Sequence, residues 1–299
     1  MNEIIFIIGP TATGKTEIAH QFAKRINAEI VSADSMLFYK EVSIITSKPP
    51  EYMLKEVPHH FVNIISATQS YSVFDYFNAA VKIIQDIFAR TCPIVVCGGS
   101  GLYIKALLDG IFGGVGEDKE LRKKLETQAH KFGKEYLHEE LRKVDPQTAE
   151  RVNDLRRIIR ALEVYRLTGV PLSQKKQEAK GLWGNLPIKM FGLNFQREKL
   201  YERINKRVDV MFEGGAVREV ESLLKLKLSS TSEKIIGIKE ISGYLKGEYN
   251  IEQAKELMKK NTRNFAKRQL TWFRADKRID WIDRDDLTPK QVVDRLLGC

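Results

Sequence analysis

The fold is decided by residues 4–16, which read Ile4-Ile5-Phe6-Ile7-Ile8-Gly9-Pro10-Thr11-Ala12-Thr13-Gly14-Lys15-Thr16. The first part is apolar and mostly β-branched, which is typical of a buried parallel strand. The second part matches GxxxxGK[ST], the pattern of a phosphate-binding loop, and residues with helical apolar spacing follow it. The stretch therefore predicts a strand, a phosphate loop and a helix at the start of a parallel α/β sheet.

The residue types in this loop determine its chemistry. Gly9 and Gly14 let the backbone curl, so that successive N–H groups and the positive end of the helix surround a diphosphate. Lys15 would neutralise a terminal phosphate, and the Thr16 hydroxyl would be available to magnesium. We therefore predict a diphosphate site formed by Gly9, Pro10, Thr11, Ala12, Thr13, Gly14, Lys15 and Thr16.

The loop pattern indicates a diphosphate and is not specific for ATP. A hydrolysing NTPase normally carries an acidic residue at the end of a second apolar strand, to hold magnesium and position water. Here the apolar run at 93–97 ends in Gly98-Gly99-Ser100, and Asn205-Lys206-Arg207-Val208 lacks the aspartate of the guanine-reading NKxD sequence. Motor and GTPase functions are thus disfavoured, and group transfer from a phosphorylated donor is favoured.

Asp34 is the candidate acid of this site. It closes a strand predicted at 29–33, and open α/β sheets bind their ligands at the carboxyl ends of their strands. The Asp34 carboxylate would then face the phosphate loop and accept a proton from an incoming nucleophile. The alternative is that Asp34 only caps the helix that follows, as Asp-Ser pairs often do.

Strands and helices alternate along most of the chain, as in a parallel α/β fold. Between about 112 and 185 the pattern changes to helices without strands, bounded by segments with Gly and Pro at 113–116 and 181–187. We therefore expect a P-loop NTPase-like catalytic core with C-terminal helices, formed by residues 1–111 and 186–299. The remaining segment, 112–185, would be a helical insertion domain.

The charge and the cysteine content indicate what class of partner the chain binds and in which compartment it is found. The chain has 299 residues, with 49 Lys and Arg against 39 acidic residues and a net charge of +10, which favours a polyanionic partner. The cysteines Cys92, Cys97 and Cys299 have neither a zinc-ligand spacing nor a disulfide pattern. No stretch has the length of a membrane span or the pattern of a signal peptide. We expect a cytoplasmic monomer.

Further motifs accompany the phosphate loop in a fixed order. They are Ser32-Ala33-Asp34-Ser35, Thr46-Ser47-Lys48-Pro49, Pro58-His59-His60, Tyr71-Ser72, Gly98-Gly99-Ser100-Gly101-Leu102-Tyr103, Arg160-Ala161-Leu162-Glu163-Val164 and Lys267-Arg268-Gln269-Leu270-Thr271-Trp272. In this order and spacing they resemble the bacterial tRNA dimethylallyltransferase (tRNA isopentenyltransferase) family over about 4–283. The resemblance implies a prenyltransferase that moves a dimethylallyl group from dimethylallyl diphosphate to tRNA. The acceptor would be the exocyclic amine of the adenosine next to the anticodon on its 3′ side.

The same resemblance implies roles for individual residues. The donor diphosphate would occupy the loop in place of a nucleotide, with Mg²⁺ as cofactor. Asp34 would be the catalytic base, with Lys15 and Ser100 as further catalytic residues. The tRNA would be bound by Asp34, Ser35, Met36, Leu37, Ser100, Arg122, Arg156, Arg157, Ile158, Ile159 and Arg160.

Three positions depart from the usual pattern of that family. Ser100 replaces a usual threonine and keeps the hydroxyl group. Ile45 replaces a usual glycine before Thr46, and Ile238 replaces a usual tyrosine. The last change leaves open whether the segment around Ile238 and Lys239 contacts tRNA.

A basic helix surface is predicted in the insertion. In the helix at 154–166 the apolar residues fall on one face, which places Arg156, Arg157 and Arg160 together on the other. This face would contact tRNA, or it could be only a solvated helix surface. Near the C-terminus, Lys267, Arg268 and Arg274 surround Trp272, and we assign Trp272 and Phe265 to the core rather than to base stacking.

Two other functions remain open from the residues alone. A small-molecule P-loop kinase would use Asp34 to activate a hydroxyl group and would consume ATP. A non-catalytic RNA-binding protein would hold phosphate in its loop and would bind tRNA without turning over a donor. The sequence does not determine which tRNAs are used or which prenyl donor is preferred.

Overall fold

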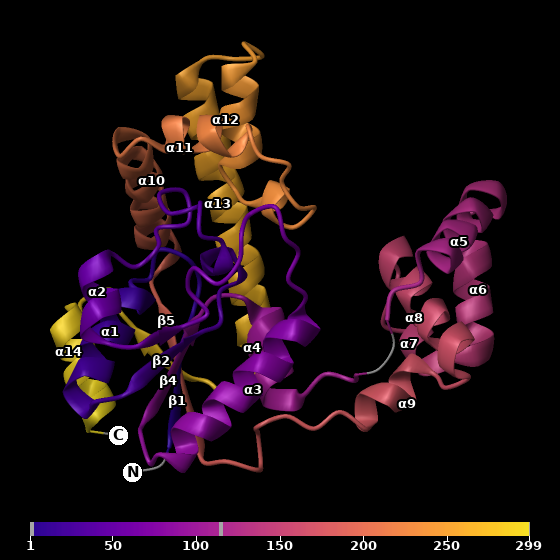
Figure 1. Ribbon diagram of the computed structural model, residues 1–299, viewed down its shortest axis with the longest axis horizontal. Helices are drawn as coiled ribbons and strands as arrows, with labels where there is room; N and C mark the ends of the chain where they lie inside the picture. The colour runs from indigo at the N-terminus through magenta and orange to yellow at the C-terminus, as the bar shows by residue number, and fades with distance from the viewer. Residues whose placement is uncertain (1–2, 114–115, 299) are drawn as a thin grey trace. The chain divides into compact units, whose positions relative to one another are not determined.

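A computed structural model describes residues 3–113 and 116–298. The chain forms two compact units, one from Met1–Leu108 and Leu182–Cys299 and the other from Asp109–Gly181 (Figure 1). The second unit corresponds to the insertion expected at 112–185. Its C-terminal limit falls earlier because the N–H groups of Leu182 and Trp183 donate to Leu107 O and Leu108 O, at 2.8 and 2.9 Å, within the first unit. Residues 114–115 of the expected Gly-rich hinge lie outside the described residues.

The first unit is built on a six-stranded parallel sheet with strand order β3-β2-β4-β1-β5-β6. The strand that leads into the phosphate loop, β1, is central, and it pairs with β4 and β5. The bounds are β1 (Ile4–Ile8), β2 (Glu29–Ser32), β3 (His59–His60), β4 (Ile94–Gly98), β5 (Ile188–Asn194) and β6 (Asp280–Asp283). The predicted parallel α/β core is therefore confirmed.

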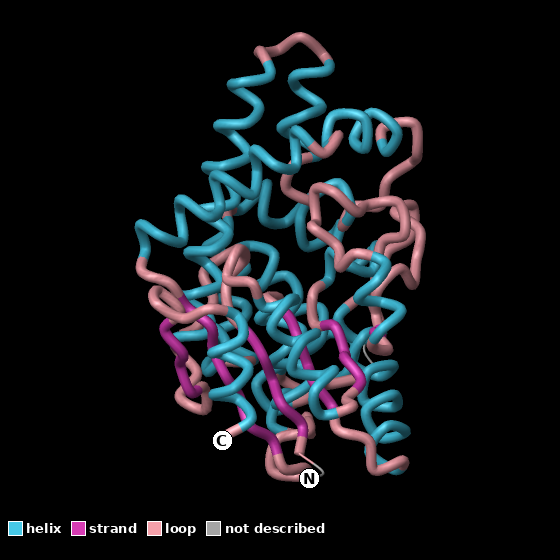
Figure 2. The backbone as a smooth tube through the Cα atoms, turned by 90° about the vertical axis from the view of Figure 1, so that its left-hand side faces the viewer, coloured by secondary structure: helices cyan, strands magenta, loops and turns pink. Residues whose placement is uncertain are grey.

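Helices cover both faces of this sheet, as Figure 2 shows. Side chains alternate between the faces of a strand, so Phe6 packs in one cluster with α3 (Val73–Ala89) and α4 (Gly101–Asp109). Its neighbour Ile7 packs in the other cluster, with α1 (Lys15–Ile26) and α14 (Pro289–Leu297). Burial on both faces explains why β1 is a continuous apolar run rather than an alternating one.

A group of helices in the same unit packs around a separate apolar cluster, which includes Val208, Ile238 and Met258. These helices are α10 (Arg197–Glu213), α11 (Ala216–Leu223), α12 (Ile238–Leu245) and α13 (Ile251–Arg274) (Figure 1). The long helix α13 packs against both α10 and α12.

Within its described residues, the second unit contains helices and no strand. They are α5 (Lys119–Phe132), α6 (Lys134–Val144), α7 (Pro146–Ala149), α8 (Leu155–Thr168) and α9 (Leu172–Gln177). Their core is a cluster centred on Leu125, Leu137, Leu141, Ile158 and Leu162. Among the described residues of the chain, no helix has the length and apolar character needed to cross a membrane.

The remaining short elements lie in the first unit between β2 and α3. They are the 3₁₀ helix η1 (Ser35–Phe38), the helix α2 (Glu51–Glu56) and the strand β3. A further 3₁₀ helix, η2 (Ser232–Lys234), precedes α12. None of these was predicted, because such short segments lack a detectable period.

Candidate active site

The phosphate loop connects β1 to α1 and has the backbone geometry expected from its glycines. Gly9 has a φ of 146°, and a Cβ atom there would lie 2.4 Å from Leu193 O. Gly14 has a φ of 78°, and a Cβ atom there would lie 2.5 Å from the Arg284 guanidinium. Ala12 also has a positive φ, 66°. The close approach of β5 and Arg284 thus explains why both glycines are required.

Side chains from the loop itself and from later parts of the chain bind the carbonyl groups of this loop. Arg203 Nε donates to Ala12 O at 2.9 Å, and the Arg284 guanidinium donates to Thr13 O. Pro10 O accepts hydrogen bonds from Thr13 Oγ1 at 2.9 Å and from Lys15 Nζ at 2.8 Å. With its carbonyl groups held in this way, the loop presents the N-terminal N–H groups of α1 to an anion.

Gln269 links the loop to the end of β4. Its Oε1 accepts from Thr11 N at 2.9 Å, and its Nε2 donates to Gly99 O at 2.8 Å. The side chain is buried, so both polar ends of the amide are satisfied where an unpaired group would be costly. Gln269 therefore connects the phosphate loop to the Gly98-Gly99-Ser100 turn and fixes their relative position.

Arg207 is a partly buried cation beside the loop. Its guanidinium donates to Thr11 Oγ1 at 2.9 Å and to Thr46 O at 3.1 Å. Neither of these partners is charged. Its hydrogen bonds thus go only to neutral oxygens, so the guanidinium can still bind an anion, although the nearby charge of Asp34 already attracts it.

Lys15 is the second cation at the loop. Burial lowers the pKa of Lys15 to about 8, and the nearby charge of Arg207 acts in the same direction, whereas Asp34 opposes the shift. The ammonium group donates to Pro10 O in this structure. A diphosphate in the loop would supply the negative charge that this site lacks.

Asp34 follows β2, and its two carboxylate oxygens have different surroundings. Oδ1 accepts from Met36 N at 3.1 Å and so caps η1. In the part of the chain that the structure describes, Oδ2 has no hydrogen-bond partner. The capping alternative considered above is therefore correct for one oxygen, while the other remains available to a ligand.

Ser100 lies next to the Asp34 segment. Its hydroxyl accepts from Ser35 N at 3.3 Å and lies 3.5 Å from the Ser35 hydroxyl. Ser100 N donates to Ala33 O at 3.2 Å. These bonds tie the end of β4 to the end of β2.

One cavity of about 260 Å³ brings these groups together within the first unit. Its polar part contains Thr11, Lys15, Thr16, Asp34 and Arg207. Its apolar part is formed by Met36, Leu37, Ile45, Val208, Met211, Ile235, Ile236, Met258 and Phe265. The predicted residues Met36 and Leu37 thus line the same cavity as Asp34 and Lys15, whereas Ser35 and Ser100 do not line it.

The segment that carries Ile45 is held by a carboxylate. Glu219 accepts from the N–H groups of Ser43, Ile44 and Ile45, at 2.7, 2.8 and 3.0 Å. The Ile45 side chain lies against Gly237, where an added Cβ would be 3.2 Å away. Ile238 is buried in the same apolar cluster, so its side chain is not on the surface.

The metal-binding capacity of the cavity is limited. Among the described residues, no group of three or more His, Cys, Asp or Glu side chains could hold a metal ion. Thr16 and Asp34 do line the same cavity, and magnesium commonly binds through one or two protein groups together with substrate phosphates and water. The donor set therefore fits a magnesium ion that arrives with a diphosphate, and it does not fit a resident metal centre.

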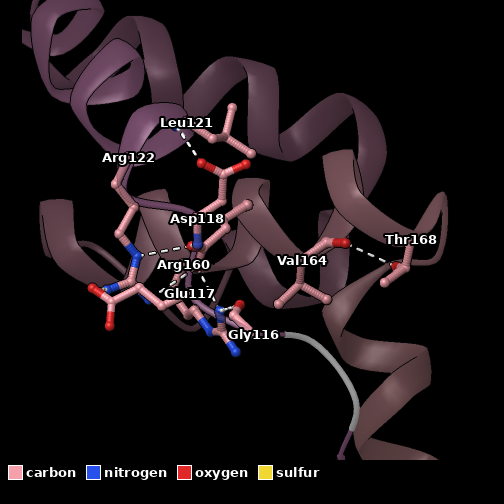
Figure 3. Close-up of polar contacts among 9 residues, drawn as sticks. Gly116, Glu117, Asp118, Leu121, Arg122, Arg160, Val164 and Thr168 are labelled. Carbon is pink, nitrogen blue, oxygen red and sulfur yellow. Dashed lines mark hydrogen bonds and ion pairs between the residues drawn. The ribbon is translucent and has the colours of Figure 1, made fainter.

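In the second unit, Arg122 and Arg160, both labelled in Figure 3, pair with the same buried carboxylate, that of Glu163. Glu163 is fully buried and accepts from Arg122 at 2.9 and 3.0 Å, from Arg160 at 2.5 Å and from Asp118 N at 2.9 Å. Arg122 also pairs with Glu117. These two predicted tRNA-binding arginines thus take part in the packing of α5 against α8.

The other predicted tRNA-binding residues of α8 differ in their exposure to solvent. Arg156 and Arg157 are exposed, and Arg157 pairs with Asp154 at 3.2 Å. Ile158 and Ile159 are buried in the core of the unit. The prediction that Arg160 shares the open face with Arg156 and Arg157 was wrong, because Arg160 turns toward Glu163.

Sequence reasoning also missed or misplaced residues in the first unit. Arg207 and Gln269 were not predicted as site residues, although Arg207 occurs among the inward-facing positions of α10, which was a usable signal. Trp272 was assigned to the core, but 43% of its surface is exposed. Phe265 is partly buried and lines the cavity.

The fold and the site together define a class of protein. A parallel α/β sheet presents a phosphate loop at the carboxyl end of its central strand, facing an aspartate across a partly apolar cavity. The family model described as IPP transferase matches residues 37–276. The chain belongs to the IPP transferase family.

Named relatives and solved structures agree with this assignment. The chain is 42% identical over 298 residues to a tRNA dimethylallyltransferase of Acetivibrio thermocellus, covering 98% of this chain and 95% of the relative. It is 44% identical over 288 residues to one of Halothermothrix orenii, covering 94% and 87%. The crystal structure of a tRNA isopentenylpyrophosphate transferase from Bacillus halodurans matches with a TM-score of 0.72 and 35% identity, covering 100% of this chain and 96% of that one. A eukaryotic dimethylallyltransferase acting on tRNA matches with a TM-score of 0.85 and 28% identity, covering 99% and 77%.

The lowered pKa of Lys15 predicts a pH-dependent affinity for diphosphate. Below a pH of about 8 the ammonium is charged and attracts the anion, and above it the side chain becomes neutral. The affinity for pyrophosphate should therefore fall as the pH rises above about 8, by up to about tenfold per pH unit. Titration calorimetry from about pH 7 to pH 9.5 measures this.

Lys15→Ala is the matched control, because the ligand's own ionisation affects both proteins equally. The variant should bind pyrophosphate more weakly, and the ratio of wild-type to variant affinity should shrink as the pH rises. A ratio that stays constant over this range would show that Lys15 does not titrate against the bound anion.

Proposed function

We infer that this chain is an enzyme that transfers a dimethylallyl group to tRNA. Its membership of the IPP transferase family extends over most of its length. The observation that carries the assignment is the single cavity in which Lys15 and Arg207 meet the Asp34 carboxylate. Such a cavity can hold an anionic leaving group close to a proton acceptor.

We propose that the donor is dimethylallyl diphosphate. Its diphosphate would lie in the phosphate loop, where the N-terminal N–H groups of α1, Lys15 and Arg207 can bind it. Its short hydrocarbon group would enter the apolar part of the same cavity, which Met211, Ile235 and Met258 help to form. This arrangement supports a donor with an anionic head and an apolar tail rather than a nucleoside triphosphate.

The proposed acceptor is the exocyclic amine of the adenosine next to the anticodon on its 3′ side. That amine is a weak nucleophile, because its lone pair is delocalised into the purine ring. The adenosine must leave its base stack to reach Asp34, and this costs least in a single-stranded loop. Met36 and Leu37 line the cavity beside Asp34 and would contact the withdrawn base.

The proposed reaction exchanges one bond for another. The bond between the allylic carbon and the ester oxygen of the diphosphate breaks, and a bond from that carbon to the adenine nitrogen forms. Asp34 Oδ2 accepts the proton that the nitrogen loses, while Oδ1 remains on Met36 N and keeps the carboxylate oriented.

Catalysis depends on the charge that builds up on the departing diphosphate. Once the donor is bound, Lys15, Arg207 and the N–H groups of α1 would stabilise this charge without further rearrangement, because the loop is already held by Arg203, Arg284 and Gln269. Magnesium, when bound with the donor beside Thr16, would add further charge neutralisation.

A prenylation assay tests this function. The protein is incubated with dimethylallyl diphosphate, magnesium and unmodified tRNA, and the anticodon loop is then analysed by mass spectrometry. Wild type should add one dimethylallyl group to the loop adenosine. Asp34→Asn should reduce the single-turnover rate by about 10² to 10⁴, the usual contribution of a positioned base, while pyrophosphate binding stays normal.

The same assay separates the alternatives. A kinase would consume ATP in the presence of a hydroxyl acceptor, and a non-catalytic RNA-binding protein would bind tRNA and leave its mass unchanged. Either result with wild type, or an Asp34→Asn rate within a few-fold of wild type, contradicts the proposed reaction or the role of Asp34.

We also propose that Arg156 and Arg157 bind tRNA phosphates. They are the exposed arginines of the α8 face, whereas Arg122 and Arg160 are already bound to Glu163. Arg156→Ala with Arg157→Ala should weaken tRNA binding. It should also lower the slope of log K against log salt by about 0.7 to 0.9 for each lost contact.

Arg142→Ala with Lys143→Ala is the control for this double variant. It removes the same charge from the same unit, and its side chains pair with glutamates on α6 much as Arg157 pairs with Asp154. Binding measured across a salt series should give a smaller change in slope for the control. Equal slopes for wild type and the Arg156/Arg157 variant would mean that this face is only a solvated helix surface.

A further inference from the structure

Trp272 is an exposed aromatic side chain on the last turns of α13. Although 43% of its surface is exposed, the ring packs on Gly101, the first residue of α4. A Cβ atom added to Gly101 would lie 2.6, 2.8 and 3.2 Å from atoms of the indole. The absence of a side chain at Gly101 therefore lets the ring pack directly on the backbone of α4.

The surroundings of this ring are apolar and positively charged. Leu102, the next residue of α4, is 57% exposed. Lys105 Nζ lies 5.8 Å from the centroid of the indole ring, and Lys267, Arg268 and Arg274 on α13 are all exposed. A flat apolar surface among cations is complementary to an unpaired base attached to phosphates.

Trp272 lies next to the candidate active site along α13. Met258, Thr262, Phe265, Arg268 and Gln269 line the cavity along α13, and Trp272 follows Gln269 by one helical turn, about 5 Å. On α4, Gly101 directly follows Ser100, whose hydroxyl contacts Ser35 N. The indole therefore lies just beyond the cavity, on the helix that forms one of its walls.

We propose that Trp272, seated on Gly101 and flanked by Leu102 and Lys105, is a stacking platform for an unpaired RNA base next to the acceptor nucleotide. The proposal rests on the proposed function and assigns it a second point of RNA contact. When one nucleotide is withdrawn from a single-stranded loop, its neighbour loses a stacking partner. An exposed aromatic ring beside the cavity can replace that partner.

An RNA-binding measurement tests the platform. Trp272→Ala should weaken binding of an unmodified anticodon stem-loop by about 5- to 150-fold, the range found when base-stacking aromatics are replaced by alanine. Trp272→Phe should recover most of the affinity, whereas Trp272→Leu should not, because leucine has no aromatic face. Pyrophosphate binding should be unchanged in all three variants.

Trp183 provides the matched control. It is 42% exposed, and its ring is covered by Arg278 at 4.9 Å. The backbone N–H group of Trp183 donates to Leu108 O, near the other end of α4. Trp183→Ala should leave the affinity for the stem-loop within about twofold of wild type, a change of less than about 0.5 kcal/mol.

Fluorescence gives a second readout that a purely structural role would not move. The chain has three tryptophans, so Trp183→Phe with Trp281→Phe leaves Trp272 as the single emitter. The stem-loop should quench this emission, whereas pyrophosphate should not. Unquenched emission on RNA binding, or equal affinities for the leucine and phenylalanine variants, would overturn the platform.

The binding and prenylation measurements distinguish a wrong assignment of Trp272 from a wrong proposed function. If wild type prenylates the stem-loop and Trp272→Ala binds it equally well, the function stands and the platform is wrong. If wild type neither binds nor prenylates the stem-loop, both are wrong.

Discussion

The hydrogen bonds that hold the carbonyl groups of the phosphate loop are the interaction on which the rest of the site depends. The loop contains positive φ angles at Ala12 and Gly14, a conformation that short local contacts alone would not maintain. Arg203, Arg284 and Gln269 fix it from α10, from the residue after β6 and from α13. The C-terminal third of the chain therefore shapes a loop formed by its first residues, which explains why sheet and helices make one compact unit.

A consequence of this construction is a cavity with excess positive charge. Arg207 donates to neutral oxygens, and Lys15 donates to Pro10 O in place of an anion. Holding two cations in a partly buried site costs free energy, and a bound diphosphate offsets that cost. The charges meet a growing negative charge when the diphosphate leaves, so the same arrangement favours donor binding and bond cleavage. Asp34 lies in the same cavity, with one oxygen fixed by Met36 N and the other available.

Local patterns predicted the strand, loop and helix at residues 4–16, the parallel core and several of the cavity residues, because each depends on neighbours in the sequence. The residues that shape the loop could not be found in this way, since their partners lie between 191 and 271 positions away. Helical periodicity grouped Arg160 with Arg156, but the buried carboxylate of Glu163 one turn later decides where Arg160 points. Composition could not distinguish Trp272 from Phe273, and only the packing of α13 shows that Phe273 enters the core while Trp272 remains exposed.

The central claim is that the preformed loop holds the diphosphate of the donor. The most direct measurement is a crystal structure with an unreactive donor analogue in which sulfur replaces the oxygen between the allylic carbon and the diphosphate. The account predicts the diphosphate against the N-terminus of α1, with Lys15 Nζ moved from Pro10 O to a phosphate oxygen. The bonds from Arg203 to Ala12 O and from Arg284 to Thr13 O should be unchanged. A diphosphate bound elsewhere, with Lys15 still on Pro10 O, would contradict it.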